Sequence, residues 1–218
     1  IKINYQNKNF DENPLTKVMI GLPEIGLNLK LNINASKENK ENTYGRVGVF
    51  FPNNQFFFDY SLINKIINIK NSRLINNYFN GQLFGNLIFF PFSTFDLKLG
   101  ISVLKFKNIL NSNFIKKNIF LTKLMPFNKK INGKLHIKID EITSSSNIIN
   151  SGNANLEFEN GILIIKQIKL NMDKIGDIII EGKILEQKKE NKFIFNTQIN
   201  LNNSKTFYSR FLIPKKIG

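Results

Sequence analysis

Apolar and polar residues alternate with a period of two along much of this chain. The alternation is clearest over residues 25–33, 95–103 and 135–139, where Ile, Leu, Phe and Val take every second position. Successive side chains of a β-strand point to opposite faces, so each stretch predicts a strand with one apolar face. The sequence therefore predicts a protein built mainly of β-strands.

The last third of the chain predicts a meander of antiparallel strands. Residues 154–158 form one arm of a hairpin, and Asn160-Gly161 follows, a dipeptide that accepts the positive φ angles of a two-residue turn. The return arm is expected to place four residues on one face, namely Ile162, Ile164, Ile168 and Leu170. Residues 178–184 and 193–201 alternate similarly, so each strand would pair with the next.

Two segments carry apolar residues at a spacing closer to that of a helix. Residues 62–79 give an imperfect stripe that includes Ile63, Ile66 and Ile67, and we interpret them as a helix. Residues 113–125 show a similar stripe and stop before Pro126, where helices tend to end. One or two short helices are therefore expected beside the strands.

Strands with one apolar face must bury that face against another layer. With 218 residues, of which 42% are hydrophobic, the chain is long enough to build a core. Two short helices are too few to cover the predicted strands. A second sheet would complete the core, and so would bound acyl chains, and both solutions stay open.

The chain is strongly basic, with a formal net charge of +15 and a pI near 9.9. Such a charge can reflect an anionic partner, either nucleic acid or acidic lipid head groups. The Lys residues are scattered, however, and the tightest groups are four pairs: Lys116-Lys117, Lys129-Lys130, Lys188-Lys189 and Lys215-Lys216. Because Asn, Ile and Lys are all abundant, we attribute most of the charge to composition and expect no nucleic acid partner.

Few residues could carry catalysis or bind a metal. The chain has no cysteine and His136 is its only histidine, so a Cys- or His-based metal cluster or triad cannot be assembled. Glu157 and Glu159 would share the polar face of one strand, and Asp173 and Asp177 lack the ligand run of a calcium loop. We predict a non-enzymatic protein without catalytic residues, metal or cofactor.

Phenylalanine is unusually frequent, with 21 residues in the chain, and it forms two clusters. Phe50-Phe51 and Phe56-Phe57-Phe58 surround a Pro-Asn-Asn segment, and Phe89-Phe90-Pro91-Phe92 forms the second cluster. One interpretation is a surface that grips acyl chains or docks on a partner. The other is a hairpin whose Phe side chains fill both faces, and the sequence does not separate the two.

Two motifs in the second half of the chain resemble one known family. Residues 132–139 have the sequence NGKLHIKI, residues 152–164 have the sequence GNANLEFENGILI, and Gly182 closes the next strand. This strand followed by an Asn-Gly hairpin resembles the C-terminal region of the AsmA family, over about residues 113–213.

The resemblance implies a mainly β fold, an antiparallel meander that forms a curved, open, groove-like sheet with one or two short helices. Residues 1–112 would be the N-terminal part of the groove and residues 113–218 the AsmA-like region. AsmA-like proteins, and relatives such as TamB, are implicated in moving phospholipid and in outer-membrane homeostasis. By this resemblance the chain would be a periplasmic lipid-handling protein, held at the inner membrane by an anchor that precedes Ile1.

The expected partner is a phospholipid or another acyl lipid, bound on the apolar strand faces. The residues expected to contact it are Leu97, Leu99, Ile101, Ile137, Ile139, Leu156, Phe158, Ile162, Ile164, Ile178, Ile180, Phe193 and Phe195. The alternative is a closed β-sandwich that serves as an interaction or adhesion module without a lipid role. The sequence predicts no oligomeric state.

Overall fold

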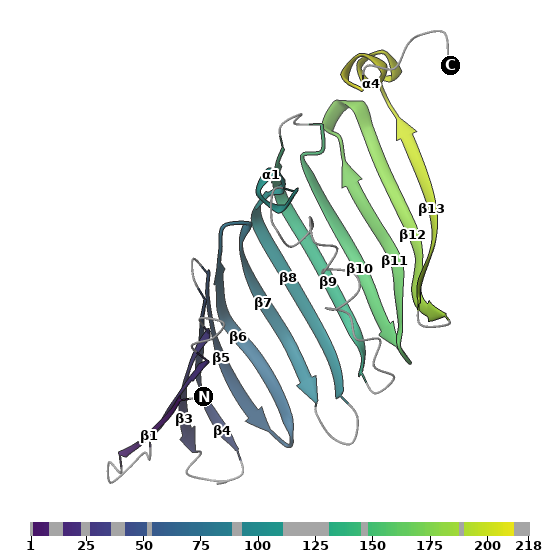
Figure 1. Cartoon of the computed structure of the whole chain (residues 1–218). Coiled ribbons are helices and arrows are strands. Elements are labelled where there is room, and N and C mark those ends of the chain that lie inside the picture. The colour runs from purple at the N-terminus through teal and green to yellow at the C-terminus, as the bar shows by residue number, and fades with distance from the viewer. Residues whose placement is uncertain are drawn as a thin grey trace. The chain divides into compact units, whose positions relative to one another are not determined.

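The computed structural model describes residues 2–8, 15–22, 27–35, 42–51, 54–88, 93–110, 131–144, 148–187 and 190–211. Within these ranges lie thirteen strands (Figure 1): β1 (Lys2–Lys8), β2 (Leu15–Leu22), β3 (Leu27–Ala35), β4 (Thr43–Phe51), β5 (Asn54–Ile63), β6 (Ile66–Ile75), β7 (Phe79–Ile88), β8 (Ser93–Lys105), β9 (Ile131–Thr143), β10 (Ser151–Glu159), β11 (Ile162–Asn171), β12 (Gly176–Gln187) and β13 (Glu190–Leu201). Two short α-helices, α1 (Phe106–Leu110) and α4 (Ser204–Arg210), and one 3-10 turn, η2 (Asp173–Ile175), accompany them.

The strands form a single sheet in which each strand is hydrogen-bonded to the next in sequence order. The pairs from β1 to β7 and from β9 to β13 are antiparallel. The strand order begins at β1 and ends at β13, so the sheet is open, and its strands are visibly curved (Figure 1). The predicted fold class, an open antiparallel meander, is confirmed. The described strands do not divide into two sheets, as a closed sandwich would require.

The chain forms two compact units, Ile1–Leu99 and Gly100–Gly218, and we describe each by itself. The division falls within β8, a continuous strand of 13 residues. The boundary expected after residue 112 concerns the extent of the family-like region, and it stays a prediction.

The helix predicted over residues 62–79 is wrong. Strand β5 continues to Ile63, a two-residue turn follows, and β6 begins at Ile66. The turn residues Asn64 and Lys65 have φ angles of 50° and 66°, the left-handed values that a tight hairpin turn requires. The apparent helical stripe arose because apolar residues at the end of one strand and the start of the next flank this turn.

Several other predictions fall outside the described residues. They concern the helix over 113–125, the Phe89–Phe92 cluster and the four Lys pairs. Conversely, α1 and α4 were not predicted as helices. Helix α4 begins at a capping residue, Asn203, whose side-chain oxygen accepts a hydrogen bond from the backbone N–H of Thr206 at 3.0 Å.

In the first unit, cross-strand register gathers apolar side chains on one face of the sheet. Val18, Leu31 and Val47 lie side by side on β2, β3 and β4, and Phe58 of β5 continues this row. A bulge in β6 centres on Asn71, which has a φ of 45°. The bulge shifts the strand register so that Ile69 and Leu74 lie on the same face, although five positions separate them.

In the second unit, the predicted hairpin is confirmed. Asn160 and Gly161 connect β10 to β11 with φ angles of 51° and 81°. At the other end of these strands, Ile148, Met172 and Ile175 form a buried cluster with Phe207 of α4 packed against it. We call this group the end cluster. Gly176 beside it has a φ of 147°, and a Cβ there would collide with the backbone of Asn200.

Candidate functional site

One face of the sheet in the second unit is almost entirely apolar. The register aligns Ile139, Leu170 and Ile178 in one row across the strands, and neighbouring rows repeat the pattern. We call this the apolar face, and its residues are Leu135, Ile137, Ile139, Leu156, Phe158, Leu163, Ile165, Ile168, Leu170, Ile178, Ile180, Ile184, Phe193, Phe195, Ile199 and Leu201.

The opposite face of the same strands is mostly polar and carries paired charges. Glu157 lies between Lys166 at 3.0 Å and Lys134 at 3.9 Å, and Lys169 lies 3.5 Å from Asp177. The single histidine belongs to this face, where His136 Nδ1 lies 2.8 Å from Asn155 Oδ1. Charges on one face and apolar groups on the other make each strand amphipathic.

Two of the predicted lipid-contacting residues lie on the wrong face. The register pairs Ile162 with Glu159 and Ile164 with Glu157, so both belong to the polar face. Leu163 and Ile165 take the expected positions instead and are only 3% and 7% exposed. The cause is a β-bulge at residues 166–167, which shifts the alternation of β11 by one residue before Ile168.

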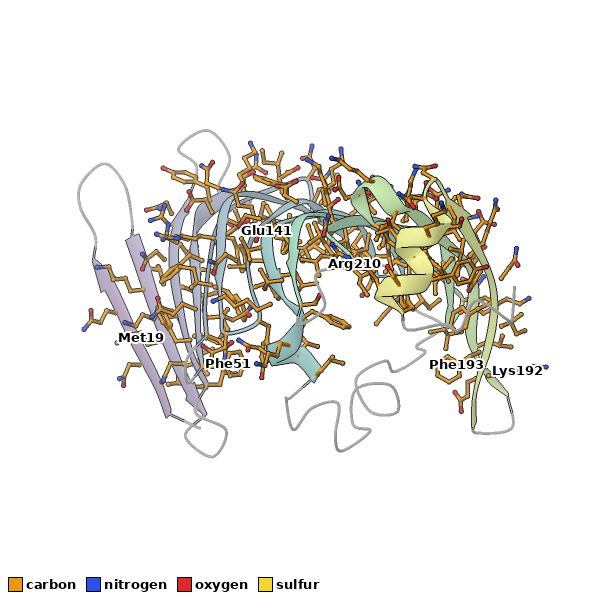
Figure 2. The ribbon with its side chains drawn as sticks, turned by 90° about the horizontal axis from the view of Figure 1, so that it is seen from above. Met19, Phe51, Glu141, Lys192, Phe193 and Arg210 are labelled. Carbon is orange, nitrogen blue, oxygen red and sulfur yellow. The ribbon has the colours of Figure 1, made fainter. Side chains whose placement is uncertain are left out.

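The other predicted residues of the second unit lie where they were expected. The apolar face includes eight of them: Ile137, Ile139, Leu156, Phe158, Ile178, Ile180, Phe193 and Phe195. Figure 2 shows Phe193 and Lys192 projecting to opposite sides of β13, with Phe193 on the side where α4 lies. Of the remaining three, Leu97 and Leu99 belong to the first unit, while Ile101 belongs to the second and is 5% exposed.

A pocket of about 520 Å³ lies in the second unit. Its lining joins segments that are distant in sequence: Leu104, Phe106, Lys107, Leu110, Ile139, Ile142, Ser144, Ile148, Ile149, Leu170 and Phe211. We call it the end pocket. Ile139 and Leu170 belong to the apolar face, and Ile148 belongs to the end cluster, so the pocket continues both.

Three large apolar side chains of the pocket lining remain substantially exposed. Phe106 is 40% exposed, Leu110 50% and Phe211 41%. Lys107 is the single charged residue of the lining, and it lies on α1 between the first two of these side chains. The pocket therefore offers apolar walls and one cation, a combination suited to a ligand with an apolar body and an anionic end.

Sequence reasoning missed this pocket, because it depends on how the strand ends are covered. The available signal was a pair of aromatic residues four positions apart, Phe207 and Phe211, whose rings lie 4.5 Å apart in the structure. That spacing places two side chains on one side of a helical turn. The pair indicates that α4 is amphipathic, but it does not indicate which part of the sheet α4 covers.

The first Phe cluster is divided between the two faces of the β4–β5 hairpin in the first unit. Phe50 and Phe57 lie on one face with ring centroids 5.2 Å apart, and Lys30 Nζ lies 5.0 Å from the Phe50 ring centroid. Phe51, Phe56 and Phe58 fall on the other face by strand alternation. The hairpin with Phe on both faces is therefore observed, its Phe side chains are only partly buried, and a role of these side chains in gripping acyl chains or docking on a partner stays a prediction.

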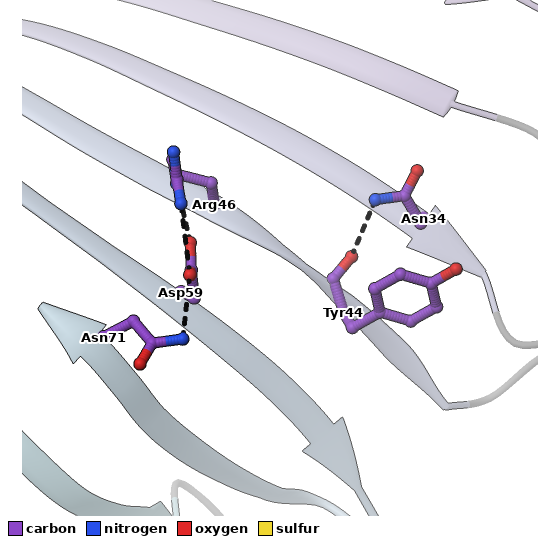
Figure 3. Close-up of polar contacts among 5 residues, drawn as sticks. All are labelled: Asn34, Tyr44, Arg46, Asp59 and Asn71. Carbon is purple, nitrogen blue, oxygen red and sulfur yellow. Dashed lines mark hydrogen bonds and ion pairs between the residues drawn. The ribbon is translucent and has the colours of Figure 1, made fainter.

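A polar cluster lies on the same face as Phe50 and Phe57 (Figure 3). Arg46 donates to Asp59 through Nε–Oδ1 at 2.6 Å and Nη2–Oδ2 at 3.1 Å, and Asn71 Nδ2 donates to Oδ2 at 3.3 Å. The hydrogen bonds from Arg46 hold the pKa of Asp59 below its ordinary value. The groups are mutually satisfied and partly exposed, which fits a role in holding strands together.

Two observations limit the roles that the described residues can have. They contain no group of three or more His, Asp or Glu side chains placed to hold a metal ion. Among the helices described, none is long and apolar enough to cross a bilayer.

No protein-family model matches the chain, and comparisons with curated proteins and with solved structures give no match.

Proposed function

We propose that this protein is a non-enzymatic, lipid-handling protein that holds acyl chains against the apolar face and in the end pocket of its second unit. The observation that supports the proposal is the end pocket itself. Its lining is apolar apart from Ser144 and Lys107, and three of its large side chains are exposed to a degree that a bound acyl chain would reduce.

The energetics of such binding are favourable on general grounds. A pocket of about 520 Å³ falls within the range of small-molecule sites. Each methylene group that leaves water contributes roughly 0.8 kcal/mol, so a short length of acyl chain would supply useful affinity. Lys107 would pair with a phosphate or carboxylate at the pocket mouth.

The setting of this activity is also a proposal. Resemblance to the AsmA family favours a phospholipid ligand, a periplasmic location, an inner-membrane anchor and a role in outer-membrane homeostasis. The open sheet supports it, because the described strands form no second sheet over the apolar face, and such a face needs other cover. No nucleic acid enters the proposal, because the Lys residues are scattered along the chain and form no polybasic block.

Native mass spectrometry of the protein purified from bacterial cells tests the proposal. We expect co-purified lipid, and we expect Phe106→Ser to reduce the bound fraction several-fold, because it removes a wall of the end pocket. Phe84→Ser is the matched control. Phe84 is also 40% exposed but lies on β7 in the first unit, so its loss should leave lipid binding unchanged.

The result that contradicts the proposal is equally specific. If no lipid accompanies the folded protein, and if a fluorescent fatty acid binds neither the parent nor Phe84→Ser, the end pocket does not hold lipid. Equal loss of binding in Phe106→Ser and Phe84→Ser would place the lipid elsewhere. Absence of lipid would favour the interaction or adhesion module.

A further inference from the structure

Strand β13 has one partnered edge and one open edge. It pairs with β12 over its full length, from Gly176 opposite Leu201 to Gln187 opposite Glu190, without a register shift. On the other side, no described strand is hydrogen-bonded to it. A strand edge with free backbone N–H and C=O groups is a template for pairing with another chain.

This edge lacks the devices that usually prevent such pairing. Residues 193–201 contain no charged residue, no Pro and no Gly. Both faces of the strand show exposed apolar side chains, at fractions from 37% to 48%: Phe193, Ile194, Phe195, Ile199 and Leu201. Strand β1, the other end of the strand order, is shorter and has Lys at its first and last positions, whereas the charged residues of β13, Glu190 and Lys192, are confined to its first three positions. Lys on an edge strand opposes edge-to-edge pairing, so the two edges differ in character.

The helix that follows β13 turns away from the open edge. Phe207 of α4 packs on the end cluster with Met172 and Ile175, and Asn202 and Asn203 donate backbone hydrogen bonds to the Ile175 carbonyl at 2.8 and 3.2 Å. These contacts draw α4 over the strand ends of the same unit (Figure 1). The outer edge of β13 is therefore not covered by α4.

The sequence of β13 is symmetric in polarity about Thr197 except at one pair, in which Ile194 would face Asn200. An antiparallel second copy centred on this residue would place Phe195 opposite Ile199 and Phe193 opposite Leu201, all on the apolar face. On the polar face, Asn196 would meet Gln198 of the second copy. Aromatic residues opposite aliphatic ones, and Thr opposite Thr, are favourable cross-strand pairs. We propose that β13 pairs with β13 of a second copy of this chain, about a twofold axis at Thr197.

Charge is compatible with this occupant. In the proposed register Lys192 would face Asn202 of the second copy, so no like charges stand directly opposite each other within the paired strands. The +15 net charge lies elsewhere in the chain, and charges beyond about 8 Å are largely screened at physiological salt. A twofold axis perpendicular to the sheet keeps both apolar faces on one side, so pairing would extend the apolar face without interruption. The proposal does not depend on lipid binding.

The association is expected to be weak. Standard protein interfaces bury at least roughly 1,200 Å². A single strand pair buries less than this, and interfaces smaller than the standard size are usually transient. Sedimentation over about 10 to 500 µM protein covers the range in which such a dimer forms. Because the copies carry like net charge, added salt should strengthen the dimer, whereas it would weaken pairing with an acidic partner.

Single cysteines test the register, because the native chain contains none. In Thr197→Cys, the two cysteines would stand directly opposite each other with Cα atoms about 4.5 to 5.5 Å apart, a separation that a disulfide can bridge. In Gln198→Cys, they are diagonal neighbours at about 7 to 8 Å, too far for a relaxed bridge. We expect rapid disulfide dimers from the first variant and few from the second. Equal rates in both variants would overturn the register.

Charge reversal tests whether the occupant is a second copy. Thr197→Lys and Thr197→Glu each place like charges opposite one another, and each should raise the dimer Kd by about tenfold or more. Mixing the two variants should restore association as a heterodimer. Gln198→Lys, which would face Asn196 instead of itself, should change the Kd less. A parent chain that stays monomeric at the highest concentration, or a mixture that fails to associate, would overturn the proposal. Circular dichroism of each variant confirms folding.

Discussion

The two units of the chain bury their apolar residues to very different extents. Among the described residues of the first unit, Ile69 is the buried hydrophobic side chain, and the polar Ser72 and Asn76 are buried with it. The second unit has a larger buried set: Ile101, Ile142, Ile148, Leu163, Ile165, Met172, Ile175 and Ile184. Both units use antiparallel pairing, so strand pairing alone does not explain the difference.

For Ile148, Met172 and Ile175 of this set, the cover comes from segments that cross the strand ends in the second unit. The backbone N–H of Met172 donates to the Gly176 carbonyl at 2.9 Å, and that of Asn150 donates to the Asn171 carbonyl at 2.8 Å. These bonds fix the turns from which the end cluster is built, and Phe207 of α4 covers the cluster. A sheet with an apolar face becomes a core only where a second layer lies on it. The end cluster supplies that layer locally.

Among the substitutions considered, truncation of Met172 should reduce the stability of the second unit most strongly. Met172 is 1% exposed, and Met172→Ala leaves a cavity in the end cluster. We expect a loss of about 2–5 kcal/mol in the free energy of unfolding of the second unit. Met19→Ala is the control, because Met19 lies on β2 in the first unit and is 42% exposed. Its effect should stay within about 0.5 kcal/mol.

Hydrogen exchange shows which unit responds to these variants. Met172→Ala should accelerate exchange in β10 to β12 and leave β2 to β5 unchanged, because stability is local to each compact unit. A stability loss no larger than that of Met19→Ala would mean that the end cluster is not what stabilises the second unit.

Much of the fold could be predicted from the sequence because period-two alternation and an Asn-Gly turn are local signals. The alternation of residues 95–103 and 193–201 identified β8 and β13, and Asn160-Gly161 identified the β10–β11 hairpin. What alternation cannot show is a change of phase inside a strand. The bulge at residues 166–167 is the reason why Ile164 was predicted on the apolar face but lies on the polar face. The bulge at Asn71 interrupts the alternation of β6, which was therefore not recognised as a strand.

The end pocket could not be predicted for a different reason. Its lining combines Leu104 of β8, Ile139 of β9 and Phe211 beyond α4, which no local pattern connects. Only the register of the strands and the path of the chain over their ends bring these residues together. The apolar face was predicted as a surface, and the place where it deepens into a pocket was not.

Two serines test whether buried polar contacts stabilise the first unit, which has little hydrophobic burial among its described residues. Ser72 is 3% exposed, and its hydroxyl donates to the Leu83 carbonyl at 2.6 Å and accepts a hydrogen bond from the Leu83 N–H. Ser72→Ala leaves both Leu83 groups without this partner, and we expect a loss of about 1–3 kcal/mol.

Ser61 provides the matched control for this substitution. Its hydroxyl is buried on β5 and has no hydrogen-bond partner among the described residues. Ser61→Ala should therefore be neutral or slightly stabilising, by up to about 1 kcal/mol, because it removes a desolvated group. Urea denaturation of the two variants measures both effects. If Ser61→Ala destabilises the unit as much as Ser72→Ala, hydrogen bonding at Ser72 is not what stabilises the β6–β7 pair.

The smallest expected effect concerns the ion pair that joins β4 and β5 in the first unit. Asp59 keeps a lowered pKa because Arg46 donates hydrogen bonds to it, so the contact stabilises the charged carboxylate. The stabilisation is present above the pKa of unfolded Asp, near 3.9, and is lost as the pH falls through the lower folded value.

With Arg46 largely exposed, Asp59→Asn should cost only about 0.5–1 kcal/mol near neutral pH. The difference from the parent should shrink as the pH falls below the ordinary pKa of Asp and through the lower folded value, as followed by urea unfolding at each pH. Asp140→Asn is the control, since Asp140 and its partner Lys138 are both highly exposed, and its effect should be near zero at every pH. A pH-independent cost at Asp59 would show that the carboxylate matters for its shape and hydrogen bonds, and not for its charge.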